Sequence, residues 1–381
     1  MGDSLRLGNL IIRCLLIWIV VWNFAWNMLI VSPEWKYKTG GSVDSVSITS
    51  DGKYVVAGSG GDYVYLFNNN GNLLWKNEIG DGVNFVSITP DGRYVVVGSD
   101  WDNNGYVYLF NNNGVLLWKY ETDSPVHSVS ITPDGRYVVA GTGKRYSSWY
   151  RSFYVGYVYL FNISGDLLWK YKTGSCVNSV SITPDGEHVV AGGYDWDDGY
   201  VYLFNNNGDL LWRYNINGYV VWSVPVSITP DGEHVVAGSG DVRLINKYGI
   251  LSWEYKTGSY VNSVSITPDG KYIVAGTGGG IYLFNNNNRD LLWKYETDSP
   301  VYSVSITPDG RYIVAESGHS YYSDSFVYLF NNDGVLLWRY KTGANVESVS
   351  ITPDGKYIVV GSGDGYVYLF NNKKILFFAL L

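Results

Sequence analysis

The chain has 381 residues, of which only 16% are charged, and its formal net charge at pH 7 is −8. This acidic balance, together with the lack of any basic stripe, argues against a general nucleic-acid binder. The two cysteines, Cys14 and Cys176, exclude a disulfide framework.

Residues 1–32 precede the repetitive part of the chain and contain a long apolar segment. From Cys14 to Val31 there is no charged residue over 18 positions, which is near the lower limit for a helix that spans a bilayer of ~30 Å. Arg6 and Arg13 precede this segment, so the positive-inside tendency places the N-terminus in the cytoplasm. A cleaved signal peptide is the alternative, but Ile30-Val31-Ser32 lacks the small residues of a cleavage site. We therefore predict a single-pass membrane anchor at residues 14–31, with the remainder outside the cytoplasm.

From residue 33 the chain repeats one unit of about 40 residues eight times. Such a period is typical of a supersecondary element that buries its faces only by stacking on copies of itself. Every unit combines a tryptophan with an Asp-Gly turn, and we predict that the tryptophans are structural. The tryptophans are Trp35, Trp75, Trp118, Trp169, Trp212, Trp253, Trp293 and Trp338.

Each unit contains four short runs rich in Val, Ile, Tyr, Phe and Trp, which favour β-strands. Thr-Pro-Asp-Gly joins the first two runs, and Asn-Asn-Asn-Gly or a near variant joins the last two; both are tight-turn sequences. The middle runs are apolar on both faces, so each four-stranded antiparallel sheet must be covered on both sides. Eight sheets stacked around an axis meet this requirement, which predicts an all-β, eight-bladed β-propeller. In the sixth unit the four runs are Val261–Thr267, Tyr272–Gly276, Ile281–Phe284 and Leu291–Tyr295.

The two ends of the repetitive part predict how the ring closes. Residues 33–40 contain a lone fourth strand around Trp35, whereas the eighth unit ends with its third strand at Phe370. The N-terminal strand can complete the last sheet and remove two open edges. The apolar tail at residues 374–381 could compete for that edge, but we favour the strand that carries the repeat's own tryptophan. The predicted organisation is a stub and anchor at residues 1–32, a propeller at 33–373 and a hydrophobic tail at 374–381.

The repeat is similar to those of known propeller families. Leu-Leu-Trp-Lys-Tyr-Lys-Thr-Gly, Gly-Tyr-Val-Tyr-Leu-Phe-Asn-Asn-Asn-Gly and the Gly-x-x-x-Trp spacing, as at Gly71 and Trp75, resemble PQQ-like (quinoprotein-type) propellers. Thr-Pro-Asp-Gly-Arg-Tyr-Val-Val-Ala-Gly is similar to WD40-like and YVTN-type repeats. The resemblance implies the fold, whereas such propellers serve as enzymes, sensors or scaffolds. Quinoprotein dehydrogenases carry an adjacent cysteine pair at the cofactor, and this chain has none.

Successive connections of a meander alternate between the two ends of a sheet. Connections one-to-two and three-to-four therefore share one face of the disc, which we call the turn face. The remaining connections share the variable-loop face, where nearly all the length variation falls. Binding residues concentrate on loops held by a rigid scaffold, although such insertions are also tolerated without a ligand. The variable segments are 99–104, 142–155, 194–198, 215–225 and 319–325.

The loops of units two to four could form one aromatic and charged patch. Indole rings offer a wide apolar surface and a few such residues usually dominate an interface. Carboxylates beside them can accept hydrogen bonds from sugar hydroxyls or pair with basic side chains, so the patch suits a protein or glycan ligand. The predicted ligand-binding residues are Asp100, Trp101, Asp102, Arg145, Trp149, Arg151, Asp195, Trp196 and Asp197.

Patterns for catalysis or cofactor binding are sparse. Asp100-x-Asp102-x-Asn104-Gly105 matches the start of a calcium loop, but the expected twelfth residue, a glutamate, is Asn111. Asp and Asn before Gly are also common turn residues. The four histidines have no metal-ligand spacing, and His188 and His234 replace the tyrosine that usually follows the Asp-Gly turn. We therefore predict no catalytic residue and no cofactor, with calcium as the minor alternative.

These features together predict a membrane-anchored, extracytoplasmic propeller that acts as a scaffold for a protein or glycan and catalyses no reaction. A PQQ-dependent or other propeller enzyme is one alternative, suggested by the resemblance alone. A structural component of envelope assembly is the other.

Overall fold

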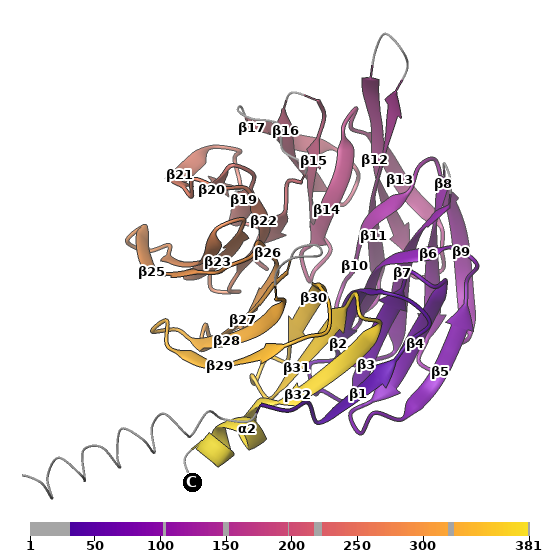
Figure 1. Cartoon of the computed structure of the whole chain (residues 1–381). Coiled ribbons are helices and arrows are strands. Elements are labelled where there is room, and N and C mark those ends of the chain that lie inside the picture. The colour runs from indigo at the N-terminus through magenta and orange to yellow at the C-terminus, as the bar shows by residue number, and fades with distance from the viewer. Residues whose placement is uncertain are drawn as a thin grey trace, which may run out of the picture.

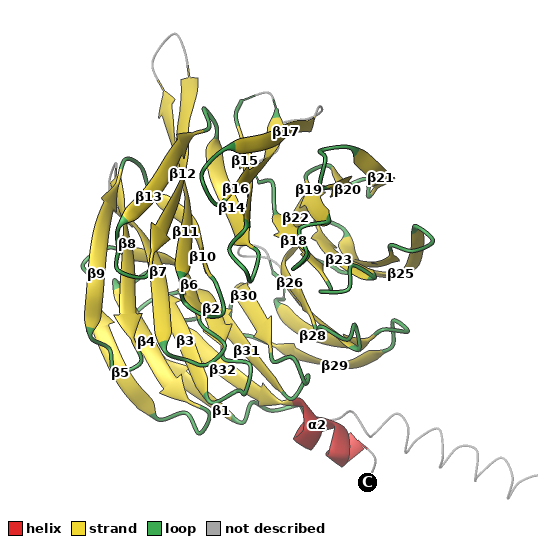
Figure 2. Ribbon diagram, turned by 180° about the vertical axis from the view of Figure 1, so that it is seen from behind, coloured by secondary structure: helices red, strands yellow, loops and turns green. Residues whose placement is uncertain are grey.

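The computed structural model describes residues 31–101, 104–147, 152–196, 198–216, 223–318 and 324–379. These residues form eight four-stranded antiparallel sheets, which are arranged around a central axis (Figures 1 and 2). The predicted all-β, eight-bladed propeller is thereby confirmed. The anchor predicted at residues 14–31 lies, apart from Val31, outside the described residues. Within the described part of the chain, no helix is both long and apolar enough to cross a membrane.

Blades 1 to 4 follow one another along the chain. Blade 1 consists of β2 (Val43–Ile48), β3 (Tyr54–Ser59), β4 (Tyr63–Asn68) and β5 (Leu73–Glu78). Blade 2 consists of β6 (Gly82–Ile88), β7 (Tyr94–Trp101), β8 (Asn104–Asn111) and β9 (Leu116–Thr122). Blade 3 consists of β10 (Val126–Ile131), β11 (Tyr137–Ser147), β12 (Ser152–Asn162) and β13 (Leu167–Lys172). Blade 4 consists of β14 (Cys176–Ile182), β15 (His188–Tyr194), β16 (Gly199–Asn205) and β17 (Leu210–Ile216).

Blades 5 to 8 complete the ring. Blade 5 consists of β18 (Val226–Ile228), β19 (His234–Gly238), β20 (Asp241–Asn246) and β21 (Leu251–Lys256). Blade 6 consists of β22 (Val261–Ile266), β23 (Tyr272–Thr277), β24 (Gly280–Asn285) and β25 (Asp290–Glu296). Blade 7 consists of β26 (Val301–Ile306), β27 (Tyr312–Ser317), β28 (Phe326–Asn331) and β29 (Leu336–Lys341). Blade 8 consists of β30 (Val346–Ile351), β31 (Tyr357–Ser362), β32 (Tyr366–Asn371) and β1 (Trp35–Lys38).

The N-terminal strand β1 closes the ring by pairing with β32. Trp35 lies opposite Leu369 in an antiparallel register, and the Glu34 amide donates a hydrogen bond to the Leu369 carbonyl at 2.7 Å. The competing tail does not take this edge, because it forms helix α2 (Asn372–Ala379) beyond β32. Figure 1 shows α2 beside β1 and β32 at the closing blade. The predicted closure by the Trp35 strand is therefore confirmed.

The hydrophobic core is divided into layers between neighbouring blades. One layer joins Val56 and Leu66 of blade 1 to Val83, Val97 and Phe110 of blade 2, all almost completely buried. The first strand of each blade packs closely against the second strand of the blade before it. Gly276 shows how close this contact is, because a Cβ there would lie 2.6 Å from Val301 Cγ1. Both faces of every sheet are therefore covered, as the apolar middle strands require.

Each repeat tryptophan packs against the next blade and donates a hydrogen bond to it. Trp75 Nε1 donates a hydrogen bond to the Asn112 carbonyl in the three-to-four turn of blade 2, at 3.0 Å. Gly114 in that turn has a φ of 79°, and a Cβ there would lie 2.8 Å from Trp75 Cγ. The turn therefore needs glycine both for its left-handed backbone and for the indole beneath it. This contact explains why glycine and tryptophan recur together, and it confirms that the tryptophans are structural.

Candidate functional site

Backbone hydrogen bonds confirm which connections share a face. On the turn face, the Asn69 amide after β4 donates to the Lys53 carbonyl before β3 at 3.0 Å. On the opposite face, the Gly60 amide after β3 donates to the Ser42 carbonyl before β2 at 2.9 Å. Connections one-to-two and three-to-four therefore lie together, and the variable loops lie at the other end of the sheets.

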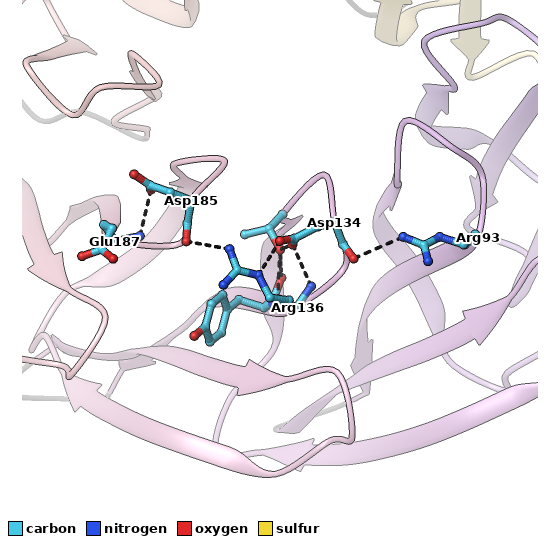
Figure 3. Close-up of polar contacts among 7 residues, drawn as sticks. Arg93, Asp134, Arg136, Asp185 and Glu187 are labelled. Carbon is cyan, nitrogen blue, oxygen red and sulfur yellow. Dashed lines mark hydrogen bonds and ion pairs between the residues drawn. The ribbon is translucent and has the colours of Figure 1, made fainter.

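Side chains of the turn face are occupied in holding the turns and the neighbouring blades. Asp134 Oδ1 accepts hydrogen bonds from the Arg136 amide at 3.0 Å and from Thr132 Oγ1 at 2.8 Å. Burial alone would raise the pKa of Asp134, but these bonds and the Arg136 guanidinium lower it to about 2. Arg136 also donates to the Asp185 carbonyl of blade 4 at 3.2 Å, and Arg93 of blade 2 donates to the Asp134 carbonyl (Figure 3). The Asp134 carboxylate and the guanidinium groups of Arg93 and Arg136 are therefore already partnered.

The two histidines at the turn face take the packing position of the tyrosine that they replace. A Cβ on Gly186 would lie 2.4 Å from the Tyr137 ring of the blade before it, and one on Gly232 would lie 2.9 Å from His188. His234 stands in the same relation to Gly270, at 3.1 Å. The interpretation of His188 and His234 as packing substitutions is confirmed.

On the variable-loop face, the structure brings together two of the predicted ligand-binding residues from different blades. Strands β11 and β12 extend beyond their neighbours at the top of Figure 1, and they carry Arg145 towards blade 4. The Arg145 guanidinium carbon lies 4.6 Å from the centroid of the Trp196 ring. Trp196 nevertheless remains 51% exposed, so about half of its surface is open to a ligand.

Asp195 lies beside this pair and is held in place. Its Oδ2 accepts a hydrogen bond from the Tyr200 hydroxyl at 3.1 Å, and its Oδ1 accepts one from the Asp198 amide at 2.9 Å. Burial and the charge of Asp195 raise the pKa of Tyr200 to about 12, so Tyr200 stays a hydrogen-bond donor at neutral pH. The carboxylate is thus fixed next to an exposed indole.

The other predicted ligand-binding residues are placed less completely. Asp100 lies in β7 opposite Gly105, and the backbone of Trp101 pairs with that of Asn104. Asp102, Trp149, Arg151 and Asp197 lie outside the described residues. In the part of the chain that the structure describes, no group of three or more His, Cys, Asp or Glu residues is arranged to hold a metal ion.

A cavity on the propeller axis was not predicted from the sequence. It has a volume of about 440 Å³ and is lined by residues from the first strands of all eight blades. Serines of these strands link blade to blade, as where Ser45 Oγ accepts a hydrogen bond from the Val86 amide at 3.1 Å. Phe85 and Pro225 occupy the corresponding positions in blades 2 and 5. The polar lining is therefore continuous except at these two blades.

The polar residues at one end of the cavity come from bulges in the first strands. The register shift between Val43 and Ser45 leaves Asp44 unpaired, and the shift between Val346 and Ser348 leaves Glu347 unpaired. These bulges lie where each first strand begins, next to the four-to-one connection, so they belong to the variable-loop face. The bulge position is the variable second residue of an otherwise uniform Val-x-Ser-Val-Ser-Ile pattern, and that contrast is the sequence signal for it. Its occupants include Asp44, Asn84, His127, Asn178, Asn262, Tyr302 and Glu347.

Neighbouring acidic groups contribute to raising the pKa of two carboxyl groups at this end of the cavity. Burial and the charge of Asp100 raise the pKa of Asp44, and burial and the charge of Asp44 raise the pKa of Glu347. Burial lowers the pKa of His127, and its Nε2 contacts the Gly143 carbonyl at 2.8 Å. The mouth of the cavity on the variable-loop face is therefore acidic.

Family comparisons agree with the architecture. The family model described as outer membrane protein assembly factor BamB matches residues 19–148 and 261–374, which is well over half of the chain. A model described as WD domain, G-beta repeat, matches residues 165–205. No curated protein matches the chain.

Solved propellers are similar to the chain over most of its length. The C-terminal WD40 domain of Sif2 has 16% identity and a TM-score of 0.72, and the match covers 90% of this chain and 98% of that one. Sqt1 of Saccharomyces cerevisiae has 14% identity and a TM-score of 0.70, with 88% and 97% covered. Sqt1 of Chaetomium thermophilum, bound to the N-terminus of ribosomal protein L10, has 17% identity and a TM-score of 0.69, with 87% and 97% covered. At these identities the likeness shows the fold alone.

Proposed function

The chain belongs to the family of the outer membrane protein assembly factor BamB, and from this premise we propose that it is a non-catalytic scaffold that binds a partner protein. The binding surface is the variable-loop face. The observation that carries the proposal is the difference between the two faces. Side chains of the turn face bond to the neighbouring blade, as Arg136 does to Asp185, whereas the opposite face presents the exposed Trp196 and the acidic mouth of the axial cavity.

A protein is the favoured partner, and a glycan is the alternative. A propeller of the same fold has been solved bound to the N-terminus of ribosomal protein L10, which supports a peptide segment as the bound element. Trp196 and Asp195 would also suit a sugar ring, because an indole can stack on it and a carboxylate can accept hydrogen bonds from its hydroxyls.

The function test compares the two faces directly. A variant with Trp101, Trp149 and Trp196 replaced by alanine should capture at least ten-fold less partner protein from a solubilised cell extract than the unmodified protein does. Its melting temperature should stay unchanged, because the described indole, Trp196, is exposed. The matched control replaces three exposed asparagines of the turn face, Asn70, Asn113 and Asn207, and should bind normally. Loss of binding in the asparagine variant alone would show that the turn face is the binding surface.

The same proposal includes attachment to a membrane through residues 14–31, with the propeller outside the cytoplasm. Strand β1 runs from the turn face towards the variable-loop face, since Trp35 pairs with Leu369 near the end of β32. An anchor that precedes β1 would therefore leave the variable-loop face directed away from the membrane. The turn-face ends of the fourth strands also carry exposed leucines, such as Leu74 at 45% and Leu117 at 44%, which suit a position near lipid.

Protease treatment of intact cells tests this topology. The protease should digest the propeller, because the arginines before residue 14 keep the N-terminus in the cytoplasm. Digestion only after the cells are permeabilised, or recovery of the full-length protein in the soluble fraction, would contradict the proposal. A cytoplasmic marker protein that survives the treatment provides the control for cell integrity.

A PQQ-dependent enzyme is the alternative function that the repeat resemblance suggests. PQQ carries three carboxylates, and the axial cavity presents Asp44 and Glu347, so the two would repel each other. The adjacent cysteine pair of quinoprotein dehydrogenases also has no counterpart, because the chain has only Cys14 and Cys176. The chemistry of the cavity therefore does not fit this cofactor, and we derive no reaction from it.

A further inference from the structure

Blade 7 departs from the repeat at a single buried position. Glu316 of β27 lies opposite Ser303, where blade 6 has Gly276 opposite Ser263. At Gly276 a Cβ would already come within 2.6 Å of the next blade, so the position is crowded. Glu316 is nevertheless there, with an exposed fraction of 0%. The same position is glycine in the other seven blades, at Gly58, Gly98, Gly141, Gly192, Gly238, Gly276 and Gly361.

The carboxyl group of Glu316 is only half satisfied. Its Oε1 accepts a hydrogen bond from the Tyr302 amide at 3.1 Å, while its Oε2 has no hydrogen-bond partner among the residues that the structure describes. Tyr302 lines the axial cavity. Burying an unpaired carboxylate is costly unless a proton or a positive charge accompanies it, so packing alone gives no reason for a glutamate here.

Glu316 stands at the end of an acidic arc that crosses four consecutive blades. Burial and the charge of Glu347 raise the pKa of Glu316 well above its ordinary value. The charge of Asp44 in turn helps to raise the pKa of Glu347, and the charge of Asp100 helps to raise the pKa of Asp44. These groups belong to blades 7, 8, 1 and 2, and beyond them His127 of blade 3 faces Asp100. The charge of one acid of the arc thus disfavours ionisation of the next one.

No basic side chain of the described residues forms an ion pair with Asp44, Glu316 or Glu347. Among the side chains that the structure describes, the Ser42 hydroxyl alone donates a hydrogen bond to Asp44, at 2.6 Å. Asp44 and Glu347 therefore line a cavity of about 440 Å³ without a basic partner among the described residues. A cation entering from the variable-loop face would relieve this repulsion.

The arrangement suits an organic cation better than a metal ion. A metal needs several ligands converging on one point, and no such group occurs among the described residues. A guanidinium group has five N–H donors in a planar fork, so it can reach carboxylates that lie apart, as Asp44 and Glu347 do on blades 1 and 8. Its apolar stem would also suit the apolar parts of the cavity wall, such as Phe85 and Val129.

We propose that the mouth of the axial cavity on the variable-loop face binds an arginine side chain of the partner protein, held between Asp44 and Glu347 with Glu316 behind them. This inference rests on the proposed function, since it names the chemistry of the bound segment. The partner is then a protein whose binding segment is extended and basic. Lysine can occupy the same place, with fewer hydrogen bonds.

The probe for this site is a fluorescein-labelled peptide with three arginines separated by Gly-Ser, and its partner probe has citrulline in place of every arginine. Citrulline keeps the shape of the side chain and removes its charge. Fluorescence anisotropy with the full-length protein should show that the arginine peptide binds at least ten-fold more tightly than the citrulline peptide. Equal binding of the two peptides, or no binding of the arginine peptide, would overturn the proposal.

Two charge-matched variants separate the cavity from general attraction to an acidic protein. The double substitution Asp44→Asn with Glu347→Gln should weaken binding of the arginine peptide at least ten-fold and leave the melting temperature unchanged or higher. The control, Glu187→Gln with Asp333→Asn, removes the same charge from exposed positions of the turn face and should change binding less than two-fold. Equal weakening in both variants would assign the binding to net charge and would refute the site.

Two further results distinguish this inference from the proposed function. Glu316→Gly restores the glycine of the other blades, so it should raise the melting temperature and weaken binding of the arginine peptide. Unchanged binding of the arginine peptide by that variant would show that Glu316 does not contribute to the site. If capture of the natural partner requires the three tryptophans but not Asp44 and Glu347, that result would support the scaffold function and contradict the arginine site.

Discussion

Replacing Trp338 with alanine should lower the free energy of unfolding by about 3–5 kcal/mol, the range typical of a buried aromatic side chain. Trp338 is only 4% exposed, and its ring centroid lies 5.3 Å from that of Phe370 in blade 8. Its Nε1 donates a hydrogen bond to Asn372 Oδ1 at 3.2 Å. The substitution therefore opens a cavity between blades 7 and 8 and leaves a buried amide oxygen with one donor fewer.

Two control variants show which part of the contact matters. Trp338→Phe keeps most of the packing and removes the hydrogen bond, so it should lower the free energy of unfolding by only about 1–3 kcal/mol. Trp196→Ala removes an indole that is 51% exposed and should change the stability by less than about 1 kcal/mol. Chemical denaturation followed by intrinsic fluorescence measures all three. Similar unfolding midpoints for Trp338→Ala and Trp196→Ala would show that the contact of Trp338 with blade 8 contributes little to stability.

Removing the closing strand β1 should destabilise the propeller more than any single substitution does. A chain that starts at residue 41 lacks β1, so β32 becomes an open edge next to the apolar core of blade 8. Open edges pair with other chains, and the loss of Trp35 also removes its hydrogen bond to the Asn69 carbonyl of blade 1 at 3.0 Å. We expect most of the truncated protein to form oligomers or aggregates.

Size-exclusion chromatography with light scattering provides the measurement for this truncation. The matched control is a chain that starts at residue 31, which keeps β1 and should stay monomeric at the same concentration. A monomeric protein starting at residue 41, with the melting temperature of the control, would contradict the role of β1 as the closing strand. In that case the tail beyond β32 would be the first candidate for the missing fourth strand.

Part of the candidate site could be predicted from the sequence, because loop insertions break an otherwise regular repeat. The insertions in units three and four led to Arg145 and Trp196, and the structure brings these two together at 4.6 Å. The axial cavity could not be predicted in the same way. Its lining comes from the first strands of all eight blades, and its acidic residues Asp44 and Glu347 lie at bulges in two of them. A bulge depends on pairing between strands, which leaves only a weak trace in the sequence.

The sequence by itself determined the number of blades, the strands and turns of each blade, and the structural role of the repeat tryptophan. These features are local: the strands follow from short apolar runs, the turns from Pro-Asp-Gly and Asn-Gly, and the stacking from the repeat period. Only the tertiary structure decided that Glu316, Glu347, Asp44 and Asp100 form one acidic arc. Glu347 and Asp44 lie near opposite ends of the described chain, and they become neighbours because the ring closes between blades 8 and 1, where the Val46 amide donates a hydrogen bond to Ser348 Oγ at 3.2 Å. Charge repulsion acts through space and not along the chain, so this arc exists only in the closed propeller.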